Sequence, residues 1–290
     1  MIPRAMLPPS PRWSALLLPL ALAACASLSS DTARRSLVDA ERAFAALAAE
    51  RGIRASFLAS FAADGIGFDP APMVLPEKWG ARPVPANPLA YSLAWHPVVA
   101  GVARSGDLGF TTGPSRFVDT TGKVPPWTGV YFSVWRRGAD GAWKVAADIG
   151  IQTPDAVSDA AFGADPVVRA SPVPIALPSS LDSADARASG DAGAFVAALA
   201  DDVRWHLDER MPIVGRAAVA AARASDARKL RFVTRGREAA ASADLGYTYG
   251  VIESSGAIES AGAIAGYYLH LWTRGEDGAW RLIAAVHLPS

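Results

Sequence analysis

Cysteine is nearly absent from this chain of 290 residues, because Cys25 is its single representative. One cysteine forms no internal disulfide and leaves none for a zinc cluster. Net charge is also absent, since 28 basic and 28 acidic side chains cancel. Without a basic field we expect no nucleic-acid partner. No phosphate loop, G-x-S-x-G elbow or dinucleotide fingerprint occurs, so we expect no cofactor.

The N-terminus has the pattern of an export signal. Arg4 and Arg12 precede an apolar run at 13–24, which is short for a permanent membrane span. The run ends in Leu-Ala-Ala before Cys25 and resembles the bacterial lipobox, in which such a cysteine is lipidated. We predict a lipoprotein signal peptide at 1–24, lipidation of Cys25 and a tether at 25–30. The alternative is an ordinary signal peptide with a cysteine near its cleavage site.

The predicted signal peptide and lipidation site imply a membrane as partner and a location in the cell. Acyl chains on Cys25 would hold the protein on a membrane, since each buried CH₂ contributes about 0.8 kcal/mol. The predicted location is the cell envelope. By resemblance to Gram-negative lipoproteins, Ala26 after the cysteine implies the outer membrane, facing the periplasm.

An internal repeat sets the domain count. Residues 105–113 match 242–250, and 129–147 match 266–284 with ten identities in nineteen positions, both at an offset of 137. A period this long indicates a duplicated domain. We predict domains at 31–152 and 179–290. The proline-rich stretch 153–178 between them is predicted to be a linker.

Each copy starts with helical patterns and continues with strands. In the first, helix 31–49 with Asp31 as N-cap and helix 53–61 precede strands at 93–104, 108–118, 127–137 and 142–151. The predicted class is α+β. Each of the two tandem, cone-shaped domains would pack N-terminal helices on a curved antiparallel sheet.

Several motifs carry a family resemblance. Asp-Asp-Val at 201–203, Pro-Ile-Val-Gly-Arg-Ala-Ala-Val at 212–219 and the W-x-R-G-x-D-G-A-W-R strand ends resemble the nuclear transport factor 2-like superfamily. It includes SnoaL-like and ketosteroid isomerase-like proteins, and the first copy is most similar to an uncharacterised secreted branch. The resemblance implies an apolar pocket at the wide end of each cone. The proline-rich segment 70–88 departs from the pattern and is expected to cover or reshape the first pocket.

The catalytic constellation of the ketosteroid isomerase relatives is incomplete. Those enzymes combine a carboxylate base with a tyrosine and a protonated aspartic acid. Neither first helix contains a tyrosine, which argues against an isomerase of that type. Asp148 alternates with Trp143, Val145, Ala147 and Ile149, so it should face away from them. On a pocket face it would be a candidate base; the alternative is a solvent-facing or ion-paired Asp.

The second copy holds three of the four histidines. His206 and His287 are candidate acid–base residues. His270 with Tyr247, Tyr249 and Tyr268 are candidate pocket residues. No short ligand spacing supports a metal site, so none is predicted. The alternative is a set of independent, half-buried sheet residues, and His96 is expected to be structural.

Two functions remain open. One is an envelope lipoprotein that binds a small apolar ligand or a protein partner. The other is a SnoaL-like isomerase, cyclase or hydratase that acts on a hydrophobic carbonyl compound, with Asp148, or with His206 and His287, moving a proton. In either case we expect the two copies to pack as an intrachain pseudo-dimer.

Overall fold

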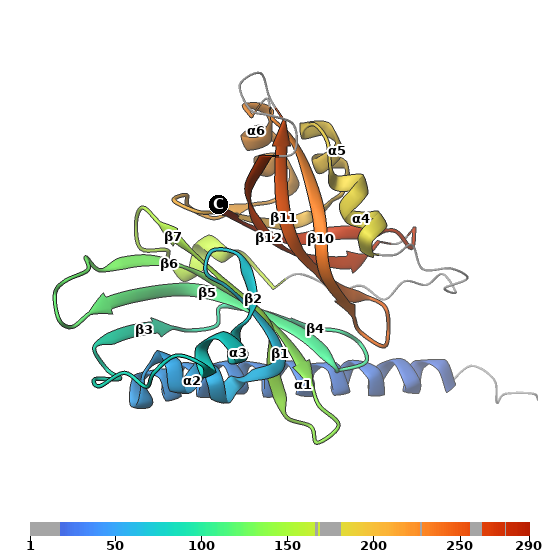
Figure 1. The fold of residues 1–290 in the computed structure, drawn as a ribbon. Helices are drawn as coiled ribbons and strands as arrows, with labels where there is room; N and C mark the ends of the chain where they lie inside the picture. Colours follow the sequence, from blue (N-terminus) through green and yellow to red (C-terminus); the bar gives the residue numbers. More distant parts are fainter. Residues whose placement is uncertain (1–17, 166–167, 169–180, 227, 256–262, 276) are drawn as a thin grey trace, which may run out of the picture.

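The computed structural model describes residues 18–165, 168, 181–226, 228–255, 263–275 and 277–290, and in these it contains two sheets, each with its own helices (Figure 1). The predicted signal peptide lies largely outside these residues. The first domain comprises α1 (Leu18–Arg51), α2 (Ile53–Ser60), β1 (Phe61–Phe68), β2 (Pro72–Val74), α3 (Leu75–Gly80), β3 (Tyr91–Trp95), β4 (Val99–Val102), β5 (Leu108–Asp119), β6 (Trp127–Arg137) and β7 (Trp143–Thr153).

The second domain repeats this order. It comprises α4 (Leu181–Ala188), α5 (Ala192–Ala197), β8 (Leu199–Leu207), β9 (Ile213–Val214), α6 (Arg216–Ala224), β10 (Lys229–Ala239), β11 (Leu245–Ser255), β12 (Ala263–Arg274) and β13 (Trp280–Pro289). The strand orders are β2-β1-β7-β6-β5-β3, with β4 on β5, and β10-β11-β12-β13-β8-β9. The predicted α+β class with two tandem domains is confirmed. One strand pair in each sheet is parallel, β1 with β7 and β8 with β13.

The first helix is longer than predicted. It runs from Leu18 to Arg51, so it continues through the segment expected to be a tether, and Asp31 lies inside it rather than at an N-cap. Leu37 and Phe44 are buried on one side of it, at the spacing of an amphipathic helix. Phe44 packs edge-on against Phe57 and Trp95 with ring centroids 4.8 Å apart in each case. Burying a side chain of this size contributes about 1.5–3 kcal/mol.

The strand predicted at 93–104 is broken in two. β3 ends at Trp95 and β4 begins at Val99, with Pro97 between them. Proline has no N–H for the ladder, which accounts for the break. The equivalent strand of the second domain, β10, has no proline and runs unbroken, with a bulge after Thr234.

A bulge in β7 changes the side on which Asp148 lies. Val145 pairs with Trp135 and Ala147 pairs with Val134, which leaves Ala146 as an extra residue. The predicted single alternation from Trp143 to Ile149 is therefore wrong. Ile149 packs in a cluster between the two sheets, whereas Asp148 lies on the opposite face, inside the first domain.

The two domains pack against each other through a shared apolar cluster. It includes Phe110 and Phe132 from the first sheet and Leu269 and Leu271 from the second. At its edge, backbone amides of each domain donate to an aspartate of the other, at positions related by the 137-residue offset. Figure 1 shows the second sheet lying across the first, with α1 on the far side of the first.

Two hydrogen bonds show this reciprocity. The amide of Arg104 donates to Oδ2 of Asp244 over 3.0 Å, and the amide of Ala241 donates to Oδ2 of Asp107 over 2.9 Å. Each aspartate thus accepts from the equivalent position of the other copy. That each domain needs its partner, as a pseudo-dimer implies, stays a prediction; separate expression of the two domains would test it.

The described part of the predicted linker is anchored to the domains. Phe162, in the short 3-10 helix η1 (Asp159–Phe162), is fully buried in the shared cluster. Its carbonyl accepts from Nε of Arg204 over 3.0 Å, and Asp165 forms an ion pair with Arg34 at 2.8 Å. This part of the linker therefore contacts both domains.

None of the helices in the described part of the chain combines the length and the hydropathy needed to cross a bilayer.

Candidate functional site

A cavity of about 570 Å³ opens in the second domain, between the sheet and the C-terminal end of α6. Its walls include Trp205, Leu207, Leu230 and Leu288, and His287 adds an imidazole to the lining. Ligand pockets generally have volumes of about 300–1,000 Å³ with apolar walls and few polar groups. The cavity has the size and composition for a small molecule.

His287 connects the cavity to the interior of the domain. It lies near the end of β13, and its Nδ1 accepts a hydrogen bond from Nε1 of Trp205 over 3.2 Å. Its Nε2 lies 2.9 Å from Nε2 of His270, a residue of the neighbouring strand β12. The register brings the two imidazoles together, because Tyr268 pairs with His287 and His270 follows two residues later on the same face.

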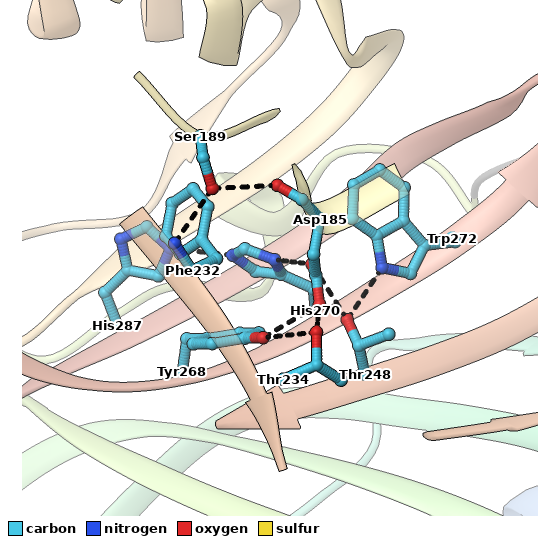
Figure 2. A network of polar contacts seen from close by, with 9 residues as sticks. All are labelled: Asp185, Ser189, Phe232, Thr234, Thr248, Tyr268, His270, Trp272 and His287. Atoms are coloured by element: carbon cyan, nitrogen blue, oxygen red, sulfur yellow. Dashed lines mark hydrogen bonds and ion pairs between the residues drawn. The ribbon is translucent and has the colours of Figure 1, made fainter. Parts of the chain in front are cut away.

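A buried carboxylate ends this series of contacts (Figure 2). Asp185 on α4 has no exposed surface, and its Oδ1 contacts Nδ1 of His270 at 2.9 Å. Three hydroxyls also donate to the carboxylate, from Thr248 at 3.0 Å, Tyr268 at 2.8 Å and Thr234 at 2.8 Å. We call Asp185, His270, His287 and Trp205, with the three hydroxyls, the Asp185 network.

The chemistry of the partners gives the network one direction. An indole N–H can only donate, so Nδ1 of His287 is an acceptor and its proton lies on Nε2. That proton is donated to His270, whose own proton then lies on Nδ1 and is donated to Asp185. Every proton therefore points toward the carboxylate.

His287 is held in its neutral form. Burial lowers its pKa well below 6.5, and the positive charges of Arg223 and Arg228 lower it further. A neutral imidazole is what the direction of the network requires. It also gives the cavity a hydrogen-bond acceptor rather than a cation.

Charged groups of both signs surround the mouth of the cavity. Arg228 forms a two-pronged ion pair with Asp226, at 3.0 Å for each oxygen. Arg223 is fully buried on α6 and donates to the carbonyl oxygens of Asp226 and Arg228, each over 3.1 Å. Asp208 and Arg210 also lie at the lining. The mouth is polar, whereas the walls are largely apolar.

The first domain has a buried carboxylate at its centre as well, but no histidine contacts it. Glu41 on α1 accepts from Nε1 of Trp95 and Oγ1 of Thr111, each over 2.5 Å, and from Nε1 of Trp135 over 2.9 Å. Burial raises its pKa, although these hydrogen bonds oppose the shift. At the offset of 137, Ser133 occupies the position of His270 and Gly150 that of His287.

Asp148 lies close to this carboxylate. Its Oδ2 accepts from Oγ of Ser133 over 2.6 Å. Burial raises the pKa of Asp148 to about 7, and the charge of Glu41 adds to the shift. The candidate base predicted from the sequence is thus a buried acid that is hydrogen-bonded to Ser133 and has its pKa raised by burial and by Glu41.

The proline-rich segment covers the first domain, as expected. Leu75 and Trp79 of α3 pack on its aromatic interior, and Trp79 stacks on Phe57 at 5.1 Å. A groove of about 400 Å³ lies outside this cover, between Trp79, the proline-rich loop and Tyr91. Glu41 is not among the residues that line this groove.

The predicted site residues do not form one group. His270, His287 and Tyr268 meet in the Asp185 network. Tyr247 and Tyr249 face the other way, into the cluster between the sheets. Tyr247 donates to Glu238 over 3.1 Å, and Tyr249 packs against Phe68. These two tyrosines are therefore interface residues and not part of a pocket shared with His270.

His206 does not join His287 either. It follows Trp205 on β8, so its ring lies on the opposite face of the sheet, 6.5 Å from Phe132 and 6.3 Å from Phe162. Within the described residues neither ring nitrogen has a hydrogen-bond partner. Burial lowers its pKa to about 3. The expected proton shuttle between His206 and His287 is ruled out by the sheet that separates them.

The remaining predictions have simple outcomes. His96 contacts Asp159 at 2.9 Å on the surface, in keeping with a structural role. Among the described residues, no three His, Cys, Asp or Glu side chains gather as a metal would require. The side chain of Cys25 lies outside what the structure describes.

Sequence reasoning missed Glu41 and Asp185. Each lies on the first helix of its copy, at a position where the apolar stripe faces the sheet: Glu41 follows Leu37 by four residues, and Asp185 follows Leu181 by four. A charged residue within an apolar stripe is the signal that was available, because such residues are rarely buried without partners.

No family model and no curated protein matches this sequence. Similar solved structures include a ketosteroid isomerase-like protein from Erwinia carotovora atroseptica, with 17% identity over 40% of this chain and 92% of that one, and a TM-score of 0.31. A nuclear transport factor 2-like protein of unknown function from Pseudomonas putida has 16% identity over 42% of this chain and 87% of that one, at 0.32.

A domain of unknown function with a cystatin-like fold from Nostoc punctiforme is also similar, with 16% identity over 37% of this chain and 69% of that one, and a TM-score of 0.30. Nuclear transport factor 2-like and ketosteroid isomerase-like proteins are thus among the solved structures that this chain is similar to, as its motifs indicated.

Proposed function

We propose that the second domain is a binding module for a small, largely apolar molecule, carried by a lipoprotein of the cell envelope. The observation behind this proposal is the cavity of about 570 Å³ with His287 as a neutral polar point in its wall. A positioned polar group beside apolar walls is typical of sites that orient a ligand.

The hydrogen bonding of the histidines favours binding over turnover. Both ring nitrogens of His270 and both of His287 are engaged within the protein. A general base needs a free lone pair within reach of the proton that it removes. The resting network offers none until Trp205 releases its hydrogen bond.

The proposed location in the cell envelope rests on the sequence of the N-terminus. The apolar run 13–24 and the small residues before Cys25 support lipidation. Replacing Cys25 with Ser should release the protein from the membrane fraction and abolish the added acyl mass in intact mass spectrometry. Retention on the membrane with no acyl mass on the unaltered protein would refute the anchor.

A second candidate function has one specific observation in its favour. The Asp185 network links a buried carboxylate to a cavity-lining imidazole, and acid–base enzymes use such pairs to move protons. The corresponding activity is that of a SnoaL-like isomerase, cyclase or hydratase on a hydrophobic compound in the second domain. A docking site for another envelope protein is the remaining alternative.

The test uses the full chain purified in mild detergent. Thermal shifts are recorded with a panel of small aromatic and alicyclic compounds. A ligand present at a hundred times its dissociation constant should add about 2.7 kcal/mol of stability. Replacing Ala265, which lines the cavity, with Trp should remove the shift by filling the space.

The matched control is Thr128→Trp, the equivalent position 137 residues earlier in the first domain. It should leave the shift intact. An equal loss in both variants, or no shift with any compound, would reject a binding role for the cavity and favour a protein partner, to be sought by crosslinking in the envelope. Conversion of a bound compound would favour the enzyme.

A further inference from the structure

The hydrogen bonds of the Asp185 network all run in one direction, and this direction decides whether the group nearest the cavity donates or accepts. Its inner end is a carboxylate that accepts four hydrogen bonds, from His270, Thr234, Thr248 and Tyr268. An ionised carboxylate can only accept. His270 must therefore donate to Asp185 through Nδ1. Its Nε2 is then an acceptor, so His287 must donate to His270.

The outer end of the network is consequently an acceptor. His287 donates through Nε2 to His270, which leaves the lone pair of Nδ1 as its outward-facing group. In the structure Nε1 of Trp205 occupies this lone pair at 3.2 Å, a distance at the long end for such a bond. Trp205 and His287 both line the cavity.

We propose that the cavity prefers molecules that carry a hydroxyl or N–H donor on an apolar body over molecules of the same shape that carry only a carbonyl or ether oxygen. This inference rests on the proposed binding function and specifies its ligand class. It replaces the carbonyl compound expected from the family resemblance with an alcohol, a phenol or an amine-like donor.

The physical reason lies in what each ligand does at Nδ1 of His287. A hydroxyl that inserts between the two groups donates to the lone pair and accepts from Nε1 of Trp205, so neither polar group is left without a partner. A carbonyl oxygen would face that lone pair acceptor to acceptor, so the Trp205 bond stays and the ligand gains apolar contact alone. A neutral hydrogen bond is worth about 0.5–1.5 kcal/mol net.

The charged mouth does not reverse this preference. Asp208, Glu209 and Asp226 are acceptors there, while Arg210 and Arg228 are donors. Arg228 is engaged with Asp226 through two nitrogens. The carboxylates at the mouth also accept from a hydroxyl, so the loss of the preference in His287→Phe is the result that assigns it to His287.

The first domain has no equivalent acceptor. Its buried Glu41 receives hydrogen bonds from Trp95, Trp135 and Thr111, and Gly150 replaces His287. Selection for donors should therefore depend on the second domain alone.

The experiment compares 2-naphthol with 2-methoxynaphthalene and 2-naphthaldehyde on the full chain in mild detergent, by isothermal titration calorimetry. We expect 2-naphthol to bind about tenfold more tightly than either analogue, the upper part of the range for one neutral hydrogen bond. Equal affinities, or tighter binding of the aldehyde, would overturn the donor preference and leave the binding role intact. Absence of binding by all three would count against the binding role itself.

Variants separate the preference from general effects on the cavity. Trp205→Phe removes the internal competitor, so the preference for 2-naphthol should rise beyond tenfold. Trp143→Phe makes the same change in the first domain, where the indole donates to Ser36, and should leave the preference unchanged. His287→Phe should abolish it.

Nitrogen-15 NMR of the histidine rings tests the polarity without any ligand. His287 should show a proton on Nε2 and a bare Nδ1. On addition of 2-naphthol the Nδ1 signal and the indole proton of Trp205 should report a new partner for each, whereas with 2-methoxynaphthalene the hydrogen bond between Trp205 and His287 should remain. A proton on Nδ1 in the free protein would overturn the inference even if no probe binds.

Discussion

The two domains share a frame and differ at its centre. Thr111, Tyr131 and Trp135 of the first domain recur as Thr248, Tyr268 and Trp272 in the second. The first surrounds a glutamate with two indoles and a hydroxyl under a proline-rich cover. The second places an aspartate behind two histidines, the outer of which lines an open cavity.

The comparison shows at which positions the two copies of the fold carry different side chains on the same strands. Ser133 corresponds to His270, and Gly150 corresponds to His287. Each pair sits on the same strands in both copies, so the backbone did not have to change. The buried acid on the first helix is common to both domains, while its connection to a cavity is present in one.

Removing the buried acid of the second domain should have the largest effect. Asp185→Ala leaves four inward donors without an acceptor, and unpaired buried polar groups cost about 1–3 kcal/mol each before relaxation. We expect a loss of about 3–5 kcal/mol in the free energy of unfolding, measured by urea titration.

Glu41→Ala is the matched change in the first domain. It should also lower stability, but ligand binding in the second-domain cavity should persist in the folded fraction, whereas Asp185→Ala should abolish it. Loss of binding in Glu41→Ala would show that the two domains do not act separately.

Asp148→Asn should stabilise the protein at alkaline pH. The pKa of Asp148 is about 7 in the folded chain against an ordinary value of 3.8, so the folded chain holds a proton that the unfolded chain loses between these values. Stability therefore falls as pH rises through this window. At pH 8 the variant should be more stable by about 2–4 kcal/mol, and at pH 4 by nothing.

Denaturant titrations at pH 4, 6 and 8 measure this trend. Asp64→Asn, which changes an exposed ion pair with Arg136, is the control and should show no such trend. A constant difference between Asp148→Asn and the unaltered protein across the three pH values would contradict the raised pKa.

His206→Phe should strengthen the contact between the domains. The first-domain counterpart on β1 is Phe68, and the imidazole of His206 has no hydrogen-bond partner among the described residues. We expect a gain of about 1–2 kcal/mol at pH 7.5, because a buried polar group without a partner is replaced by an apolar ring.

The same variant should respond to acid. The pKa of His206 is lowered to about 3 in the folded chain. Below pH 6.5 the unfolded chain therefore binds a proton that the folded chain does not, and the free energy of unfolding decreases as the pH is lowered. At pH 4 the gain should be larger by roughly 3 kcal/mol. Thermal unfolding at both pH values measures it, and an equal gain at pH 4 and 7.5 would argue that His206 titrates normally.

The reciprocal aspartates give the smallest and most symmetric prediction. Asp107→Ala and Asp244→Ala each remove one acceptor for a backbone amide of the other domain. Each should cost about 1 kcal/mol, and the two costs should be alike. A large inequality between them, measured by urea titration, would show that the interface is less symmetric than its hydrogen bonds.

The sequence allowed some of the site residues to be predicted, but it did not show which of them lie together. The repeat located matched strands, and the second copy drew attention to His270, His287 and Tyr268 because they differ from the first. Which side of a strand each residue faces depends on bulges, such as that at Ala146, which alternation in the sequence does not reveal. The placement of Asp148, Tyr247 and His206 therefore needed the structure.

By itself the sequence determined the duplication, the α+β class and most strand bounds, because these follow from local patterns of apolar residues, glycine and proline. Only the tertiary structure decided that Asp185, 85 residues before His270, contacts it, and that α3 covers the first domain while the second stays open. These outcomes depend on contacts between distant segments, and no local pattern encodes such contacts.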